Sequence, residues 1–100
     1  MMANYRNIKA LRYAAGEACQ HCFIRDLSIV AAHSNRQIHG KGMGIKAHDC
    51  FIAYLCHECH KNYDSGKMSY AVFEKAMRRT QLLLIEKKVL TAEVINSCVI

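Results

Sequence analysis

The clearest pattern in the chain is a helical repeat of apolar residues in its C-terminal third. Apolar side chains recur at intervals of three, four and seven positions: Tyr70, Phe73, Met77 and Leu84. This spacing places them on one face of an α-helix, and we predict a helix over residues 68–90. Ser69 can cap its first turn, and Lys87 and Lys88 suit the negative end of the helix dipole in its last turn.

Two weaker helical signals lie nearer the ends of the chain. Three apolar positions in residues 1–18 follow a helical period that stops near Gly16. They are Ile8, Leu11 and Ala15. Thr91 can cap a further short turn through Val94 and Ile95. Because no internal repeat or low-complexity linker separates the segments, we predict a single domain over residues 1–100.

The middle of the chain has two short β-prone runs. Residues 27–32 form an apolar run that ends at His33, and residues 51–55 form a second one. A polar loop with three glycines separates them: Gly40, Gly42 and Gly44. Strands and helices segregated in one short chain predict the α+β class.

The composition of the chain limits the kinds of partner that the protein can have. Of the 100 residues 52% are hydrophobic, enough to fill a small core and to exclude wholesale disorder. Lys and Arg number 14 against 8 Asp and Glu, which gives a net charge of +6. This charge favours a polyanionic partner, nucleic acid first, although it also aids solubility.

No apolar run approaches the roughly 20 residues that span a bilayer, so we expect no membrane partner. Residues 1–18 lack the apolar stretch of a secretion signal, which predicts a cytoplasmic location.

Cysteine spacing carries the first chemical prediction. Two Cys-x-x-Cys pairs are present, Cys19 with Cys22 and Cys56 with Cys59. The two-residue gap lets both sulfurs of a pair turn toward one ion, and Zn²⁺ accepts four such ligands in tetrahedral geometry. The alternative is two unrelated pairs of buried or redox-active cysteines, but a reducing cytosol favours metal binding. We therefore predict one structural zinc ion, and we expect Cys50 and Cys98 to be small core residues.

A second group of polar residues lies between and beside these pairs. His33 ends the first β-prone run, Asp49 precedes the second, and His60 follows the last zinc cysteine. In a helical turn over residues 57–64, His60 and Asp64 share one face at i, i+4 spacing, which is half of a site for a divalent cation. Each residue also has a structural interpretation, as a hydrogen-bonded surface histidine, a turn carboxylate or the last residue of a helix.

The order of these residues resembles a known family. A strand-end His, an Asn or Asp before a second strand, and Leu-Cys-x-x-Cys-His opening a helix is the layout of the zinc-stabilised HNH nucleases, whose fold is called ββα-metal. The closer resemblance is to the small prophage-encoded, YbcO-like nucleases of that superfamily. The matching stretches are residues 30–33, residues 42–46 with Asp49, and residues 55–60 with Asp64. The resemblance implies a ββα-metal core over about 18–66, a helical part over about 68–96, and DNA endonuclease activity.

The resemblance also implies a role for each residue. His33 matches the general base that takes a proton from the attacking water, which a neutral imidazole can do at physiological pH. His60 matches the last His of the motif, a ligand of a catalytic Mg²⁺ or Mn²⁺ ion that stabilises the leaving 3′-oxygen. Asp49 stands where the family has an Asn that organises the loop and orients the base. Many members have an acidic ligand where this chain has Ala32, so Asp64, or Asp49 itself, would complete the cation site.

The loop between the two runs is basic. Arg36, Lys41 and Lys46 accompany the glycines, and we predict that they contact nucleic-acid phosphates, although a flexible solvated loop is the alternative. No Gly-Lys-Ser/Thr follows the glycines, so we expect no nucleotide cofactor.

The predicted function is a metal-dependent DNA endonuclease of HNH type. The alternative is a non-catalytic zinc module that binds nucleic acid or a protein partner. The two hypotheses differ in the roles of His33 and His60, which are catalytic only in the enzyme. The sequence predicts no oligomeric state.

Overall fold

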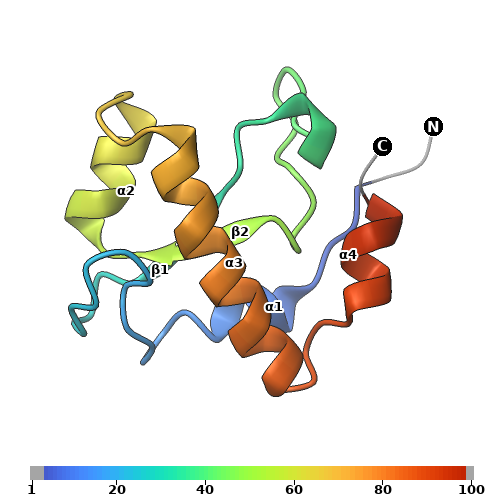
Figure 1. The fold of residues 1–100 in the computed structure, drawn as a ribbon, viewed down its shortest axis with the longest axis horizontal. Coiled ribbons are helices and arrows are strands. Elements are labelled where there is room, and N and C mark those ends of the chain that lie inside the picture. Colours follow the sequence, from blue (N-terminus) through green and yellow to red (C-terminus); the bar gives the residue numbers. More distant parts are fainter. Residues whose placement is uncertain (1–3, 99–100) are drawn as a thin grey trace.

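A computed structural model of the chain describes residues 4–98, which form helices around a small sheet (Figure 1). In chain order the elements are α1 (Ile8–Arg12), β1 (Val30–His33), the 3-10 turn η1 (Gln37–His39), β2 (Ile52–Leu55), α2 (His57–Asp64), α3 (Tyr70–Glu86) and α4 (Ala92–Cys98). The α+β class is confirmed. In the part of the chain that is described, no helix is long and apolar enough to cross a bilayer.

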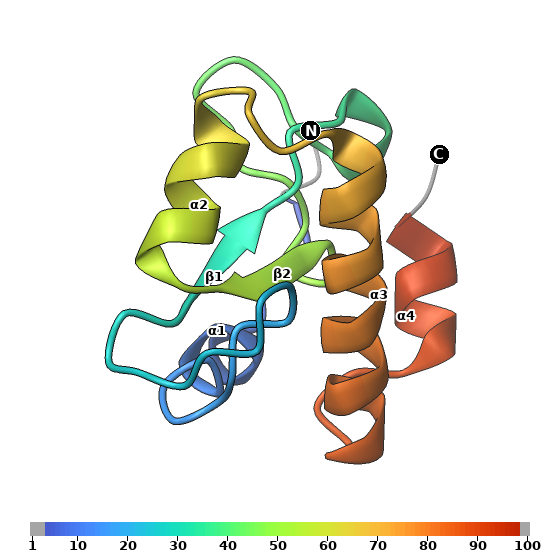
Figure 2. The same cartoon turned by 60° about the vertical axis from the view of Figure 1, so that its left-hand side comes forward.

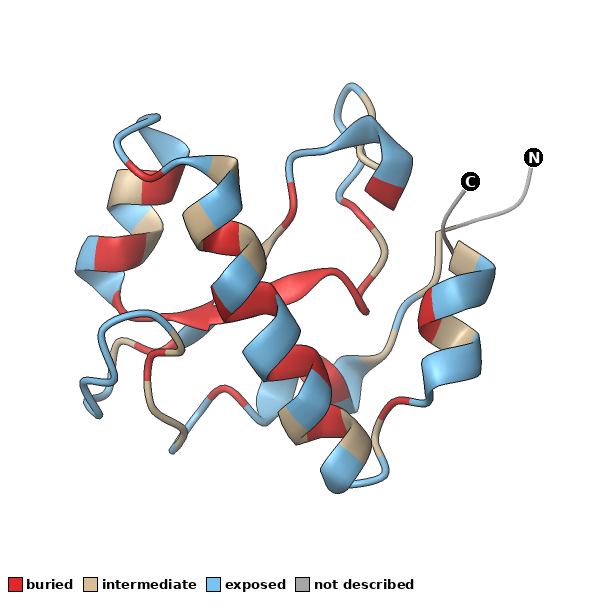
Figure 3. Ribbon diagram, viewed as in Figure 1, coloured by how far each residue is buried: buried red, intermediate tan, exposed pale blue. Residues whose placement is uncertain are grey.

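A two-stranded antiparallel sheet lies at the centre of the fold. Its register pairs Val30 with Leu55, Ala31 with Tyr54, Ala32 with Ala53 and His33 with Ile52. Every residue of β2 is buried, because α3 packs across this strand (Figures 2 and 3). A single residue, Cys56, separates β2 from α2. The pair of strands therefore leads directly into a helix.

The first strand begins later than its apolar run predicts. Leu27 is fully exposed, and the chain turns at Ser28, whose N–H and hydroxyl both donate to the Asp26 carboxylate, at 2.7 and 2.6 Å. The Ser28 hydroxyl oxygen also accepts the N–H of His57, the first residue of α2, at 2.9 Å. This local turn competes with strand pairing, so β1 starts only at Val30.

The long helix α3 has the predicted N-cap, and it is shorter at both ends than the predicted helix. The Ser69 side chain accepts the N–H of Val72 at 3.3 Å, which confirms it as the N-cap. The helix ends at Glu86, short of residue 90, and Lys87 and Lys88 follow it instead of forming its last turn. Lys88 has a left-handed backbone with a φ of 61°, a conformation that terminates helices.

The two short helices have identifiable caps. The Asn7 side chain accepts the N–H of Ala10 at 3.1 Å and begins α1. This helix buries Ala10, whereas Ile8, part of the predicted apolar stripe, is 61% exposed. The Thr91 hydroxyl accepts the N–H of Val94 at 3.2 Å, so the predicted cap of the last short helix is confirmed.

Two buried polar side chains on α3 bind the backbone on or beside β2. The Thr80 hydroxyl accepts the N–H of Tyr54 at 3.0 Å and donates to the carbonyl of Ala76 at 2.9 Å. Gln81 Nε2 donates to the carbonyl of Cys50 at 2.8 Å. A buried backbone group without a partner costs free energy comparable to a lost hydrogen bond. These side chains thus allow α3 to cover the strand.

Replacing Thr80 by Val tests this arrangement. Valine keeps the shape of the side chain but leaves the buried Tyr54 N–H without an acceptor, so the free energy of unfolding should fall by about 1–3 kcal/mol. Urea unfolding followed by circular dichroism measures the change. Leu82→Ala, at an exposed position of the same helix, is the control and should change stability by less than about 0.5 kcal/mol. Equally small effects of the two substitutions would contradict the role of the hydroxyl.

Candidate functional site

The four predicted zinc cysteines come together at the start of α2. The Sγ atoms of Cys19, Cys22, Cys56 and Cys59 all lie within 4.8 Å of one another. Those of Cys22 and Cys56 are 3.7 Å apart, close to the roughly 3.8 Å between sulfurs that are each about 2.3 Å from one tetrahedral zinc ion. All four are free thiols and form no disulfide. The donor set therefore fits a single zinc ion.

Local turns of the backbone position the two cysteine pairs. In the first pair, the N–H of Phe23 donates to the carbonyl of Cys19 at 2.9 Å. Phe23 has a left-handed φ of 66°, which costs roughly 1–2 kcal/mol for a residue with a side chain. In the second pair, Cys56 is the N-cap residue of α2 and Cys59 lies in its first turn. A metal ion bound by both pairs would offset the cost of the strained turn.

The surroundings of the sulfurs differ from one cysteine to the next. Burial acts to raise the pKa of Cys19, but hydrogen bonds from three nearby backbone groups lower it to about 7. Burial raises the pKa of Cys59, and the neighbouring sulfurs of Cys56 and Cys19 raise it further. A divalent cation removes this penalty, because cysteine binds zinc as the thiolate. His21 Nδ1 lies 3.5 Å from Cys59 Sγ and borders the cluster.

A buried carboxylate holds His33 at the end of β1. Asp49 is 2% exposed, and its Oδ1 lies 2.8 Å from His33 Nε2. Oδ1 also accepts a hydrogen bond from Arg6 Nη1 at 3.1 Å, and Oδ2 accepts the N–H of Asn7 at 2.8 Å. Both oxygens are therefore engaged, and Asp49 is poorly placed to bind a cation. Of the two carboxylates considered from the sequence, Asp64 remains the candidate ligand.

The segment 4–7 is a part of the site that the sequence analysis missed. Asn4 Nδ2 donates to the carbonyls of Gly40 and Lys46, at 2.7 and 2.9 Å. Arg6 Nη2 donates to the carbonyl of Lys46 at 2.9 Å. Most of these acceptors are backbone carbonyls, which every residue possesses, so no residue pattern could have revealed them.

Gly40 lets the same segment approach the loop closely. Its φ is 92°, and a Cβ there would lie 2.8 Å from the ring of His48. His48 Nδ1 accepts the N–H of Tyr5 at 2.9 Å, which requires an unprotonated nitrogen. Burial, followed by the charge of Arg6, lowers the pKa of His48 and favours that neutral form.

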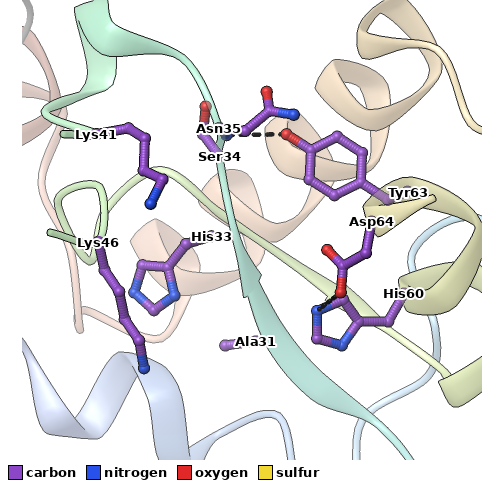
Figure 4. Close-up of a pocket in the computed structure, with 9 residues that line it drawn as sticks. All are labelled: Ala31, His33, Ser34, Asn35, Lys41, Lys46, His60, Tyr63 and Asp64. Carbon is purple, nitrogen blue, oxygen red and sulfur yellow. Dashed lines mark hydrogen bonds and ion pairs between the residues drawn. The ribbon is translucent and has the colours of Figure 1, made fainter. Parts of the chain in front are cut away.

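His33 opens onto a cleft of about 370 Å³ between β1, the glycine loop and α2. The cleft is lined by Ala31, His33, Ser34, Asn35, Lys41, Lys46, His60, Tyr63 and Asp64. Figure 4 shows Lys41 and Lys46 beside His33, with His60 and Asp64 on the side formed by α2. His60 Nε2 is 3.4 Å from Asp64 Oδ2, as their i, i+4 spacing predicts. The structure thus brings five residues singled out from the sequence to one cleft.

Two other positions are placed away from the cleft. The guanidinium of Arg36 lies 3.9 Å from the centre of the Tyr70 ring, at the start of α3, and Arg36 does not line the cleft. Ala32 is 1% exposed and faces the core. Within residues 4–98, the cysteine cluster is the one group of three or more His, Cys, Asp or Glu side chains close enough together to hold an ion.

Comparisons of the chain with protein-family models, curated proteins and solved structures find no match. The interpretation of the site therefore depends on its own geometry and chemistry. These define a four-cysteine centre that could hold zinc, next to a basic cleft with a carboxylate-bound histidine.

We expect the purified protein to contain one zinc ion per chain, bound by the four thiolates. Cys56→Ser should leave a largely unfolded chain without zinc, because three sulfurs cannot close the site and the small core depends on the cross-link. Elemental analysis and circular dichroism measure the two effects.

Cys98→Ser is the matched control for the zinc prediction. Cys98 is partly buried, packs against the core and lies outside the cluster, so its replacement should leave both the zinc content and the helical signal in place. A zinc-free wild-type protein with the same fold would contradict the prediction, as would Cys56→Ser that retains a full equivalent of zinc.

Proposed function

We propose that the chain is a metal-dependent DNA endonuclease of HNH type, with a zinc-stabilised ββα-metal core. One observation carries the proposal. His33, held by the buried Asp49 at 2.8 Å, faces the same cleft as the His60–Asp64 pair and two lysines. A fixed imidazole, a cation half-site and positive charge in one cleft are what phosphodiester hydrolysis needs.

The order of elements around the cleft also supports the proposal. Two antiparallel strands lead directly into α2, the strand-end histidine is on the first strand, and the second histidine is on the helix. One cysteine pair lies at the start of that helix. This is the layout of the HNH superfamily that the sequence resembles.

In the proposed reaction, His33 is the catalytic base and Asp49 a positioning residue. With its Nε2–H donating to Asp49, His33 has its lone pair on Nδ1. Nδ1 takes a proton from water as the water oxygen attacks the phosphorus. The bond to the 3′-oxygen breaks with its electron pair on that oxygen, which then takes a proton from solvent. His60 and Asp64 would hold a Mg²⁺ or Mn²⁺ ion, which supplies charge stabilisation of the phosphate and the leaving oxygen. A zinc ion closed by four cysteines has no open position for this task.

The alternative function is a non-catalytic zinc module that binds nucleic acid or a protein. The buried Ala32 favours it, because this position has an acidic metal ligand in many HNH enzymes and here faces the core. The alternative shares the cysteine centre and the basic cleft with the enzyme. It predicts binding without cleavage.

Replacing His33 tests the proposed base. His33→Ala should preserve the fold, the zinc and DNA binding, yet lower the rate of plasmid nicking roughly 10²–10⁴-fold. His33→Gln, which keeps an N–H for Asp49 but cannot accept the proton, should lose as much.

Three outcomes decide between the alternatives. Loss of nicking in both His33 variants supports the base. A wild type that binds DNA but cuts none with Mg²⁺ or Mn²⁺ would replace the endonuclease by the binding module. Unchanged nicking by His33→Ala would exclude His33 as the base and move that role to another residue.

Replacing His60 tests the cation half-site separately. His60→Ala should raise the concentration of Mg²⁺ or Mn²⁺ needed for half-maximal nicking, because it removes one proposed ligand. Its zinc content should stay at one ion per chain, because the four cysteines are intact. Nicking assays over a metal titration and elemental analysis provide the two measurements. An unchanged metal requirement would exclude His60 as a ligand.

A further inference from the structure

The cleft at His33 is one of four neighbouring hollows that share lining residues. A second hollow shares His60 and Asp64 with it and continues along α2 to His57 and Lys61. A third shares Ala31, His33 and Lys46 with it and runs between β1 and α1. The fourth shares Arg12 and Ala15 with the third and reaches Lys9 and Tyr13. Each hollow shares lining residues with the next, and we call this row of four hollows the α2–α1 groove.

The path of the α2–α1 groove follows the arrangement of the elements. Figure 2 shows β1 between α2 and α1, and His33 at the end of β1 lines both central hollows. The proposed catalytic base therefore lies within the groove, not at one of its ends. A linear polymer lying in the groove would extend past His33 in both directions.

The charge of the groove is almost entirely positive. Five basic side chains line it: Lys9, Arg12, Lys41, Lys46 and Lys61. Asp64 is the one acidic residue among the residues that line these four hollows. Unpaired positive charge along a groove matches the backbone of a nucleic acid, which has a phosphate at every nucleotide.

The lysines and arginines that form ion pairs lie outside the groove. Arg6 pairs with Asp49, Arg78 with Glu74, and Lys87 with Glu17. In residues 4–98, none of the five lysines and arginines of the groove forms an ion pair. The positive charges along the groove are therefore not neutralised by neighbouring carboxylates.

We propose that the α2–α1 groove binds one strand of DNA along its length, with phosphates on both sides of the cleavage point contacted at its two ends. Lys61 is the contact at the α2 end, and Arg12 with Lys9 is the contact at the α1 end. This inference rests on the proposed function for the placement of the cleaved phosphate at His33. It adds a binding surface on α1 that the glycine loop does not provide.

The test compares three single-charge substitutions that differ in position. Arg12→Ala and Lys61→Ala remove a charge from opposite ends of the groove, and Lys75→Ala removes one from an exposed position of α3 outside it. Fluorescence anisotropy with a duplex oligonucleotide of mixed sequence measures affinity over a range of salt concentrations. Zinc-loaded protein is used without added Mg²⁺ or Mn²⁺, so no cleavage is required.

We expect Arg12→Ala and Lys61→Ala each to lower affinity roughly threefold to tenfold and to reduce the salt dependence by about one phosphate contact. Their effects should multiply in the double variant, because the two sites are independent. Lys75→Ala should leave the salt dependence unchanged. Equal effects of all three substitutions would overturn the groove, as would an effect confined to one end.

Plasmid nicking by the same proteins separates this inference from the proposed function. A wild type that binds with the expected pattern but cuts no DNA refutes the endonuclease and leaves the groove standing. A wild type that cuts DNA while Arg12→Ala, Lys61→Ala and Lys75→Ala bind alike refutes the groove and leaves the endonuclease standing.

Discussion

The convergence of four sulfur atoms is the constraint on which the cleft depends. Cys22 and Cys56 are 34 positions apart in the chain and 3.7 Å apart in space at Sγ. Their cluster fixes the first turn of α2 against the loop that leads to β1, and the hydrogen bond from His57 to Ser28 reinforces this junction. A core of this size has little free energy to spare for ordering such a junction by packing alone. A shared zinc ion would supply that free energy. It would also fix which face of α2 lies toward β1.

A second, independent constraint fixes the opposite side of the cleft. Asp49 binds His33 at the end of β1, Arg6 before α1, and the backbone of Asn7. A buried carboxylate is stable only when its oxygens are compensated by charge and hydrogen bonds, and here three residues from two parts of the chain provide that compensation. The orientation of His33 therefore depends on the N-terminal segment as well as on its own strand. The cleft lies between a sulfur cluster on one side and a carboxylate on the other.

Local features could be predicted from the sequence, and features that depend on the path of the chain could not. The cap residues Ser69 and Thr91 and the His60–Asp64 pair follow from fixed spacings along a helix. The cysteine cluster follows from the geometry that a tetrahedral ion imposes on two pairs. In contrast, Arg36 and Lys46 share the glycine loop, and the sequence alone predicts the same role for both. The structure shows that the long side chain of Arg36 reaches the Tyr70 ring. Only the tertiary fold shows that Arg12 and Lys61, distant in sequence, line hollows that both adjoin the cleft at His33.

The hydrogen bonds of the segment 4–7 have a consequence for the order in which the molecule assembles. This segment leaves the ribosome early, yet Asn4 binds Gly40 at a separation of 36 positions and Asn7 binds the carbonyl of Val89 at a separation of 82. Contacts at long separation form late, because the chain between them must first be ordered. The cysteine cluster and the contacts of Asp49 with His33, Arg6 and Asn7 need no residue beyond 59, whereas the hydrogen bond from Asn7 Nδ2 waits for Val89. During synthesis, the residues that form the metal centre and hold His33 can therefore be in place before the segment 4–7 is joined to the chain that follows α3.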